Sequence, residues 1–117
     1  MKLEQKEIYN ELVSKYEFNI LQKEQIRLGL KNNVEVSIYA KPEYNCLQMQ
    51  QIRYGLEDNL DVSIYFKPEF DYQQMAQIRR GLQSGVDVTI YFNPEFEARK
   101  MEQIRLGLEN NIDAVSY

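Results

Sequence analysis

Hydrophobic and polar positions recur along this chain with a period of 26 residues. The copies align without a gap, and they occupy residues 18–43, 44–69, 70–95 and, in a shortened form, 96–117. The second and third copies are identical at 14 of their 26 positions. A fixed period of this length predicts stacked units of secondary structure, each of which buries its apolar face against its neighbours.

The first half of each copy predicts a helix whose start is marked by polar and apolar residues. In the third copy, Asp71 and Gln74 have the spacing of a capping box, and Phe70 and Met75 have the spacing of a hydrophobic staple. Apolar residues follow at spacings of three and four, which places them on one helical face. Gly and Asn tolerate the left-handed conformation that ends many helices. We therefore expect the four helices to end at Asn33, Asn59, Gly85 and Asn111.

The second half of each copy, DVSIYF in the second one, fits two structures. Its β-branched and aromatic residues suit a strand, which would point Val62, Ile64 and Phe66 inward. A short helix capped by Asp61 would instead bury Val62, Tyr65 and Phe66. The fourth copy favours the helix, because a strand would place the polar Ser116 at a core position.

We therefore expect an all-α, solenoid-like stack of four repeats, each made of a long helix and a short helix. Residues 1–17 lie outside the repeat and are expected to form an N-terminal capping helix. The whole chain, residues 1–117, is expected to be one repeat domain. An α/β solenoid with a short strand and a helix in each repeat stays the alternative.

Glycine recurs inside each expected long helix, where it costs about 1 kcal/mol relative to alanine. These residues are Gly29, Gly55, Gly81 and Gly107. A cost accepted in every copy indicates that a neighbouring helix or loop approaches the backbone closely at this position.

Composition narrows the range of functions. The chain has 14 Lys and Arg against 18 Asp and Glu, a net charge of −4, no His and one Cys, Cys46. It therefore lacks the commonest general base and metal ligand, and it cannot form an internal disulfide or a thiolate zinc site. We expect no enzyme activity, cofactor or metal. The absence of a long apolar run predicts a cytoplasmic protein that does not bind membranes, and the acidity argues against nucleic acid as a partner.

Two charged residues recur in every copy and could form a ladder along the stack. The arginines are Arg27, Arg53, Arg79 and Arg105. The acidic residues, eight positions further on, are Glu35, Asp61, Asp87 and Asp113. We interpret the ladder as structural, with pairing that neutralises the arginines and sets the stacking register; an arginine row that binds carboxylates or phosphates is the alternative.

Positions that differ between copies are released from the repeated packing and can face a partner. One such column in the expected long helix comprises Leu28, Tyr54, Arg80 and Leu106. Another, at the start of that helix, comprises Ile20, Cys46, Tyr72 and Ala98. A helical short element adds an outward row formed by Ile38, Ile64 and Ile90. Exposed apolar and tyrosine side chains are typical of partner surfaces. The first column, the isoleucine row and Tyr72 are thus candidate partner-binding residues, and burial between repeats is the alternative.

The pattern PEFxxxQMxQIRxGLxxxxDVSIYxxPEF resembles tandem repeats in proteins of Firmicutes and of their phages, plasmids and conjugative elements. The match covers nearly the whole chain after Glu17, although Lys23 replaces the methionine of the first copy. Phe66 and Phe92 replace the alanine that usually follows the tyrosine. The resemblance carries no catalytic residues. It implies a mobile-element context, in which small acidic proteins often inhibit host defence, as anti-CRISPR proteins do.

Three functional hypotheses follow. The first is a protein-binding module that inhibits a defence nuclease, such as a CRISPR effector, by occlusion or by mimicry of nucleic-acid charge, and whose partner is basic. The second is a binder of single-stranded nucleic acid that uses the arginine row and tyrosines. The third is a structural protein that self-associates, for example as a homodimer, through the isoleucine row.

Overall fold

The computed structural model describes residues 1–115, together with the side chains of residues 1–111, and this part of the chain contains helices and no strand. The long helices are α1 (Leu3–Lys15), α2 (Ile20–Lys31), α3 (Cys46–Glu57), α4 (Tyr72–Ser84) and α5 (Ala98–Val115). The short elements are single turns of 3-10 helix, namely η1 (Val36–Ile38), η2 (Val62–Ile64) and η3 (Val88–Ile90). The all-α class is therefore confirmed, and the strand alternative is wrong.

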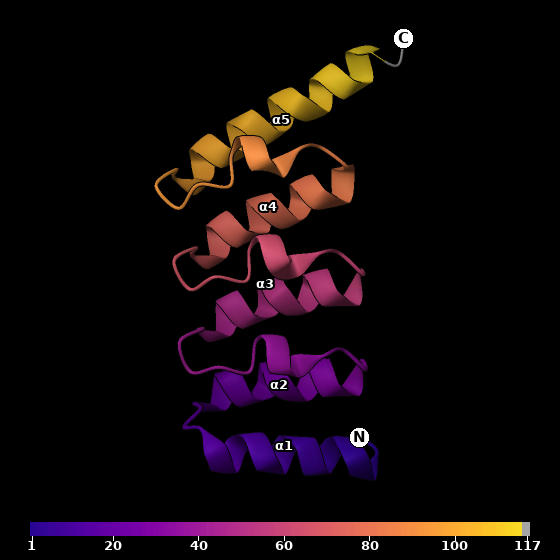
Figure 1. The fold of residues 1–117 in the computed structure, drawn as a ribbon, viewed down its shortest axis with the longest axis vertical. Helices are drawn as coiled ribbons and strands as arrows, with labels where there is room; N and C mark the ends of the chain where they lie inside the picture. The colour runs from indigo at the N-terminus through magenta and orange to yellow at the C-terminus, as the bar shows by residue number, and fades with distance from the viewer. Residues whose placement is uncertain (116–117) are drawn as a thin grey trace. The chain divides into compact units, whose positions relative to one another are not determined.

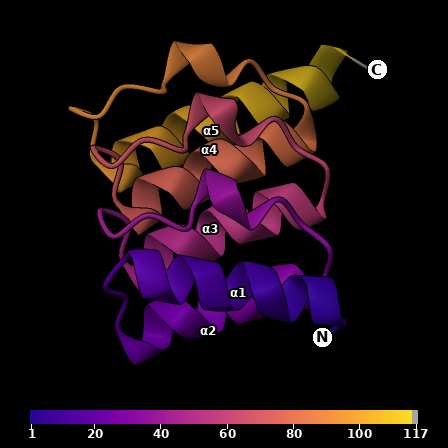
Figure 2. The same cartoon turned by 60° about the horizontal axis from the view of Figure 1, so that its bottom comes forward.

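The chain divides into two compact units, Met1–Asn59 and Leu60–Tyr117. In the first unit, α1 packs on α2 and α2 packs on α3; in the second, α4 packs on α5 (Figure 1). Within each unit the short 3-10 turns lie along one side of the long helices (Figure 2). Helices adjacent in sequence are thus adjacent in each unit, as expected for a stack.

The expected helix starts are present. In α4 the Asp71 carboxylate accepts a hydrogen bond from the Gln74 N–H at 2.8 Å, and the Gln74 side-chain oxygen accepts one from the Asp71 N–H at 2.9 Å. The same reciprocal box caps α2 and α3. Phe70 and Met75, at 1% and 0% exposure, form the buried staple beside it.

Three of the four expected helix ends are confirmed. Asn33, Asn59 and Gly85 have φ angles of 60°, 58° and 79°, the left-handed conformation that Gly and Asn tolerate. The expected end at Asn111 is wrong, because α5 continues to Val115. A separate short helix in the fourth copy is therefore also wrong over residues 113–115, while Tyr117 lies outside the described residues.

The recurrent glycines explain where a helix can end. A Cβ atom on Gly81 would overlap the Tyr91 hydroxyl and lie 2.7 Å from Val88 Cγ1, and Gly29 is equally crowded by the first copy of the same residues. The N–H of Val86 donates to the Gly81 carbonyl at 3.1 Å, which closes the end of α4. At Gly107 no described atom comes within 4 Å of such a Cβ. The end of α4 is thus held by the segment that packs on its glycine, and α5 lacks this contact among the described atoms.

The 3-10 turns place one tyrosine and one valine of each copy in the core. Tyr39, Tyr65 and Tyr91 are all 0% exposed, and the valine three positions before each of them is buried. This confirms the inward direction expected for Val62 and Tyr65 in the helical alternative. Phe66, which was expected to be buried with them, is only half-buried. A single 3-10 turn is too short to bring a third side chain into the core.

We predict opposite effects for the same substitution at two equivalent glycines. Gly81→Ala should lower the free energy of unfolding by about 1–3 kcal/mol, because the Tyr91 hydroxyl is hydrogen-bonded and cannot retreat. Gly107→Ala should raise it by up to about 1 kcal/mol, since alanine is the better helix former and meets no described atom. Urea denaturation followed by circular dichroism measures both, and equal effects at the two sites would contradict the packing described.

Candidate functional site

A polar clamp joins α2 and α3 in the first unit. The Arg53 side chain, with 7% of the residue exposed, donates from Nε to Gln25 Oε1 at 3.0 Å and from Nη1 to Glu57 Oε2 at 2.7 Å. The same carboxylate oxygen accepts a hydrogen bond from Asn32 Nδ2 at 2.6 Å. Arg53 and Glu57 come from α3, whereas Gln25 belongs to α2 and Asn32 caps its end. The arginine is therefore held by its own helix and by the helix before it.

The second unit repeats the clamp between α4 and α5. Arg105 Nε donates to Gln77 Oε1 at 3.0 Å, and its Nη1 donates to Glu109 at 3.0 Å. The hydroxyl of Ser84, at the end of α4, donates to Glu109 at 2.7 Å and thus takes the place of Asn32. These contacts hold the pKa of the Glu109 carboxyl below its usual value, first through the Ser84 hydroxyl and then through Arg105. Recurrence of the clamp at both junctions indicates a structural role for these arginines.

A buried tyrosine lies beside each clamp. The Tyr39 hydroxyl donates to the Gln25 carbonyl at 2.6 Å, and the Tyr91 hydroxyl donates to the Gln77 carbonyl at 2.8 Å. Burial raises the pKa of both phenols, that of Tyr91 to about 12, and the nearby arginine opposes this only in part. Both tyrosines are therefore neutral hydrogen-bond donors at physiological pH.

The capping-box glutamines also connect one repeat to the next. Gln74 Nε2 donates to the Pro94 carbonyl at 2.9 Å and to the Phe96 carbonyl at 2.7 Å. Gln22 donates in the same way to the Tyr44 carbonyl at 2.7 Å. Each glutamine thus caps its own helix with one end of its amide and holds the following loop with the other.

The expected ladder has different partners from those predicted. Arg27 pairs with Glu24 three residues before it, and Arg53 and Arg105 pair with the glutamate four residues after them. Arg79 donates to Gln83 at 3.4 Å. The acidic residues that were predicted as partners instead accept hydrogen bonds from the residue two positions after them. Glu35 accepts from the Ser37 hydroxyl, and Asp61 and Asp87 cap the 3-10 turns. The side chain of Asp113 lies outside the described residues.

For Arg27 and Arg53 the pairing prediction is wrong, because helix spacing favours a different acid. A residue three or four positions away lies on the same helical face as the arginine, whereas one eight positions on has passed the helix end. An aspartate before a short turn meets the free N–H groups of that turn first.

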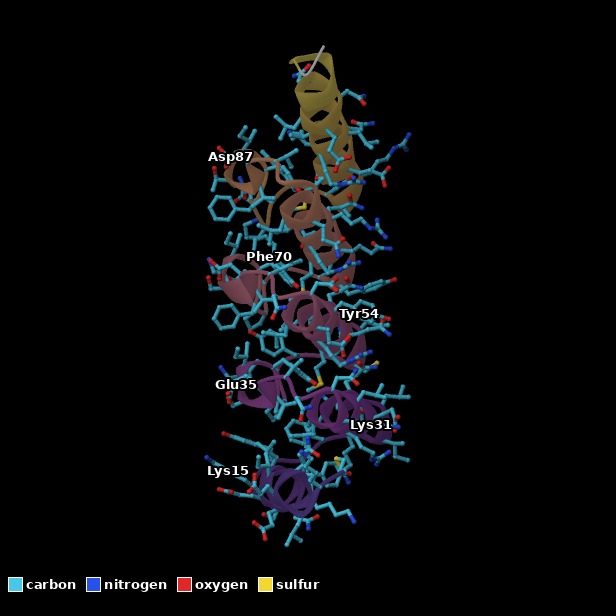
Figure 3. The ribbon with its side chains drawn as sticks, turned by 90° about the vertical axis from the view of Figure 1, so that its right-hand side faces the viewer. Lys15, Lys31, Glu35, Tyr54, Phe70 and Asp87 are labelled. Carbon is cyan, nitrogen blue, oxygen red and sulfur yellow. The ribbon has the colours of Figure 1, made fainter. Side chains whose placement is uncertain are left out.

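The columns chosen as candidate partner-binding residues fall on two opposite sides. Figure 3 shows this for the first unit, where Glu35 lies on the side of the 3-10 turn and Lys31 and Tyr54 lie on the side of the long helices. We call these sides the short-helix face and the long-helix face.

The candidate residues are exposed to different degrees. On the long-helix column, Arg80 and Leu106 are exposed and Leu28 and Tyr54 are half-buried. On the short-helix face, 54% of Ile90 is exposed, while Ile38 and Ile64 are half-buried. Tyr72, in the first turn of α4, is 36% exposed.

The exposed apolar side chains at the starts of α2 and α3 were only partly anticipated. Ile20 and Leu21 at the start of α2 are 83% and 62% exposed, and Leu47 at the start of α3 is 41% exposed. Ile20 stands in a variable column noted from the sequence, but Leu21 and Leu47 were missed. These residues could have been recognised in the sequence as apolar residues in the first turn of a helix that do not belong to its buried face.

A hollow of about 250 Å³ lies in the first unit between α1 and the segment that begins η1. Its apolar wall is formed by Ile8, Leu12, Leu30, Val34 and Val36. Its charged and polar rim is formed by Glu11, Lys15, Glu35 and Ser37. α1 joins α2 without an intervening 3-10 turn.

The second unit separates charge between its layers. Helices α4 and α5 contain five basic and three acidic residues, a net charge of +2. The connecting segments 60–71 and 85–97 contain six acidic residues and one lysine, a net charge of −5. The acidic residues are Asp61, Glu69, Asp71, Asp87, Glu95 and Glu97. The connecting segments of this unit are therefore acidic, and its long helices carry a small excess of basic residues.

Comparison with protein-family models, with curated proteins and with solved structures finds no match for this chain. In the described part of the chain, no group of three or more Cys, Asp or Glu side chains is arranged to hold a metal ion. None of the described helices has the length and apolar character needed to cross a membrane.

We predict that Tyr91→Phe changes stability in alkali. Since burial raises the pKa of Tyr91 from 10.0 to about 12, its contribution is complete below pH 10 and is lost as the pH rises through 12. The phenylalanine variant should lose about 1 kcal/mol at neutral pH through the missing hydrogen bond, and its free energy of unfolding should fall less between pH 10 and 12. Urea titrations at each pH measure both effects, and parallel pH profiles would contradict the assignment.

We predict that Glu109→Gln makes the free energy of unfolding less dependent on pH in acid. The pKa of Glu109 is lowered in the fold, so its contribution is present above the ordinary carboxyl value of 4.5 and disappears as the pH falls through the lowered value. The variant should be less stable at pH 7 and should lose less stability on acidification. Glu95→Gln, at an exposed loop position, is the matched control and should leave the acid limb unchanged.

Proposed function

We propose that this protein is a non-enzymatic protein-binding module whose partner is basic, and that it inhibits a host defence nuclease on behalf of a mobile element. The observation that carries the proposal is the combination of exposed apolar side chains with acidic segments on a scaffold in which Arg53 and Arg105 are engaged internally. Apolar anchors surrounded by charge are the usual composition of a protein interface. The mobile-element context comes from the resemblance of the repeat.

The internal clamps support protein binding over the nucleic-acid alternative. Arg53 and Arg105 each bond a glutamate and a glutamine, and Arg53 is 7% exposed. An arginine in this state cannot neutralise a phosphate without breaking the clamp. The chain also contains no histidine, which is the commonest general base.

The acidic connecting segments suit a nuclease as the partner. A nuclease binds the phosphates of its substrate with lysine and arginine side chains that line its nucleic-acid-binding groove. This basic groove also attracts an acidic protein surface. Inhibition would then arise from occupation of the nucleic-acid channel. Salt screens the attraction between exposed charges, so charge alone gives little affinity at physiological ionic strength. An apolar anchor next to the acidic residues would supply the rest.

The test combines binding with activity. Purified RNA-guided nucleases from Firmicutes are incubated with the protein and run on a size-exclusion column, and their DNA cleavage is measured at increasing ratios of protein to enzyme. We expect co-elution with at least one nuclease and loss of its cleavage near equimolar ratio.

Three results would decide against the proposal. Full cleavage by every nuclease at a large excess of the protein, without co-elution, excludes inhibition. Salt-sensitive binding to single-stranded DNA in the absence of a nuclease would favour the nucleic-acid alternative. A dimeric mass at high concentration that is abolished by Ile90→Ser would favour self-association.

A further inference from the structure

We infer that the short-helix face of the second unit is the partner-binding surface and that its occupant is a basic segment of the partner protein that presents arginine or lysine beside apolar side chains. This inference rests on the proposed function and specifies its site. The apolar part of the surface, which we call the Ile-Phe patch, consists of Ile64, Phe66, Ile90 and Phe92.

Lys67 links the two levels of the Ile-Phe patch in the second unit. Lys67, which follows Phe66, places its Nζ 6.0 Å from the centre of the Phe92 ring, so the two levels are in contact. Ile90 is 54% exposed, and Ile64, Phe66 and Phe92 are half-buried. Half-buried rings on a segment that packs against the core offer contact area to a partner and lose little conformational entropy on binding, as interface anchors do.

Acidic side chains flank this patch at both levels. Asp61 and Asp87 are exposed at the starts of η2 and η3, and Asp87 lies on the short-helix side in Figure 3. Each accepts the N–H and the hydroxyl of the residue two positions on through a single oxygen, Oδ1. The other oxygen, Oδ2, takes part in neither bond and retains its capacity to accept from a cation.

The charge and the rings together select the occupant. The segments that carry the patch have a net charge of −5, which repels an acidic partner and attracts a basic one. Lys67 near Phe92 indicates that a cation can lie against these rings. A guanidinium could stack on a phenylalanine while it donates to an aspartate, and neighbouring apolar residues of the partner would cover the isoleucines.

The first unit provides an internal comparison. Its equivalent segment, residues 34–43, has Ala40 where the second unit has Phe66 and Phe92, and its Ile38 is half-buried. That segment carries two acids and one lysine. Residues 60–69 of the second unit likewise carry two acids and one lysine, and residues 86–95 carry two acids. The units therefore differ in the two phenylalanines and in the number of such segments, and not in the charge of each segment.

The experiment uses the whole chain labelled with ¹⁵N. It is titrated with a synthetic helical peptide of leucine and arginine, and separately with a counterpart in which glutamate replaces arginine. We expect the basic peptide to shift the amide signals of residues 61–67 and 87–93 and the acidic peptide to leave them in place.

Variants that preserve the fold assign the binding to side chains. Phe66→Ala with Phe92→Ala reproduces the Tyr39-Ala40 sequence that the first unit already accommodates. This double substitution should weaken binding of the basic peptide about tenfold or more. Asp61→Asn with Asp87→Asn keeps the caps of the 3-10 turns, because Asn caps as well as Asp. This pair should also weaken binding of the basic peptide, because two negative charges are lost. Leu47→Ser, in the first unit, is the control and should leave binding unchanged.

The outcomes separate this inference from the proposed function. If shifts gather on α4 and α5 or in the first unit, or if the acidic peptide binds equally well, the surface assignment is wrong. If a nuclease is inhibited equally by the wild type and by the double alanine variant, the proposed function stands and the assignment fails. If the peptide binds the patch as expected but no nuclease is affected, the assignment stands and nuclease inhibition fails.

Discussion

The approach of a tyrosine and a valine to a helical glycine is the contact on which the first and third repeats depend. Gly29 and Gly81 leave room for the Tyr39 and Tyr91 hydroxyls, and these hydroxyls donate to carbonyls one turn earlier in the helix. The contact fixes the 3-10 turn against the long helix and so determines where the chain must go next. Capping boxes and polar clamps then hold a geometry that the glycine has made possible.

Several of these features could be predicted from the sequence because they are local. The capping boxes depend on residues three apart, and the left-handed residues Asn33 and Gly85 follow from what Asn and Gly tolerate. The recurrent glycine indicated a close approach, although the identity of the approaching group required the structure. The helical alternative for DVSIYF was correct because an aspartate before the turn and buried residues three apart fit a helical turn.

The errors arose where a local signal needs a tertiary contact to act. Asn111 resembles the residues that end the earlier helices, but no described atom packs on Gly107, and α5 continues past it. The arginines were assigned to acids in the next segment, whereas Glu57 and Glu109 on the same helix reach them first. The long-helix column was located by its variation, yet variation alone does not distinguish the exposed Arg80 from the half-buried Tyr54.

The hydrogen bonds within a repeat and between neighbouring repeats have a consequence for how the chain folds. Tyr39 reaches back 14 residues, Gln22 reaches forward 22, and Arg53 reaches back 28. Loops of this size close at little entropic cost, and chains rich in short-range contacts fold fast. Folding can therefore begin at any junction and spread one repeat at a time, and a terminal repeat can open while the next remains closed.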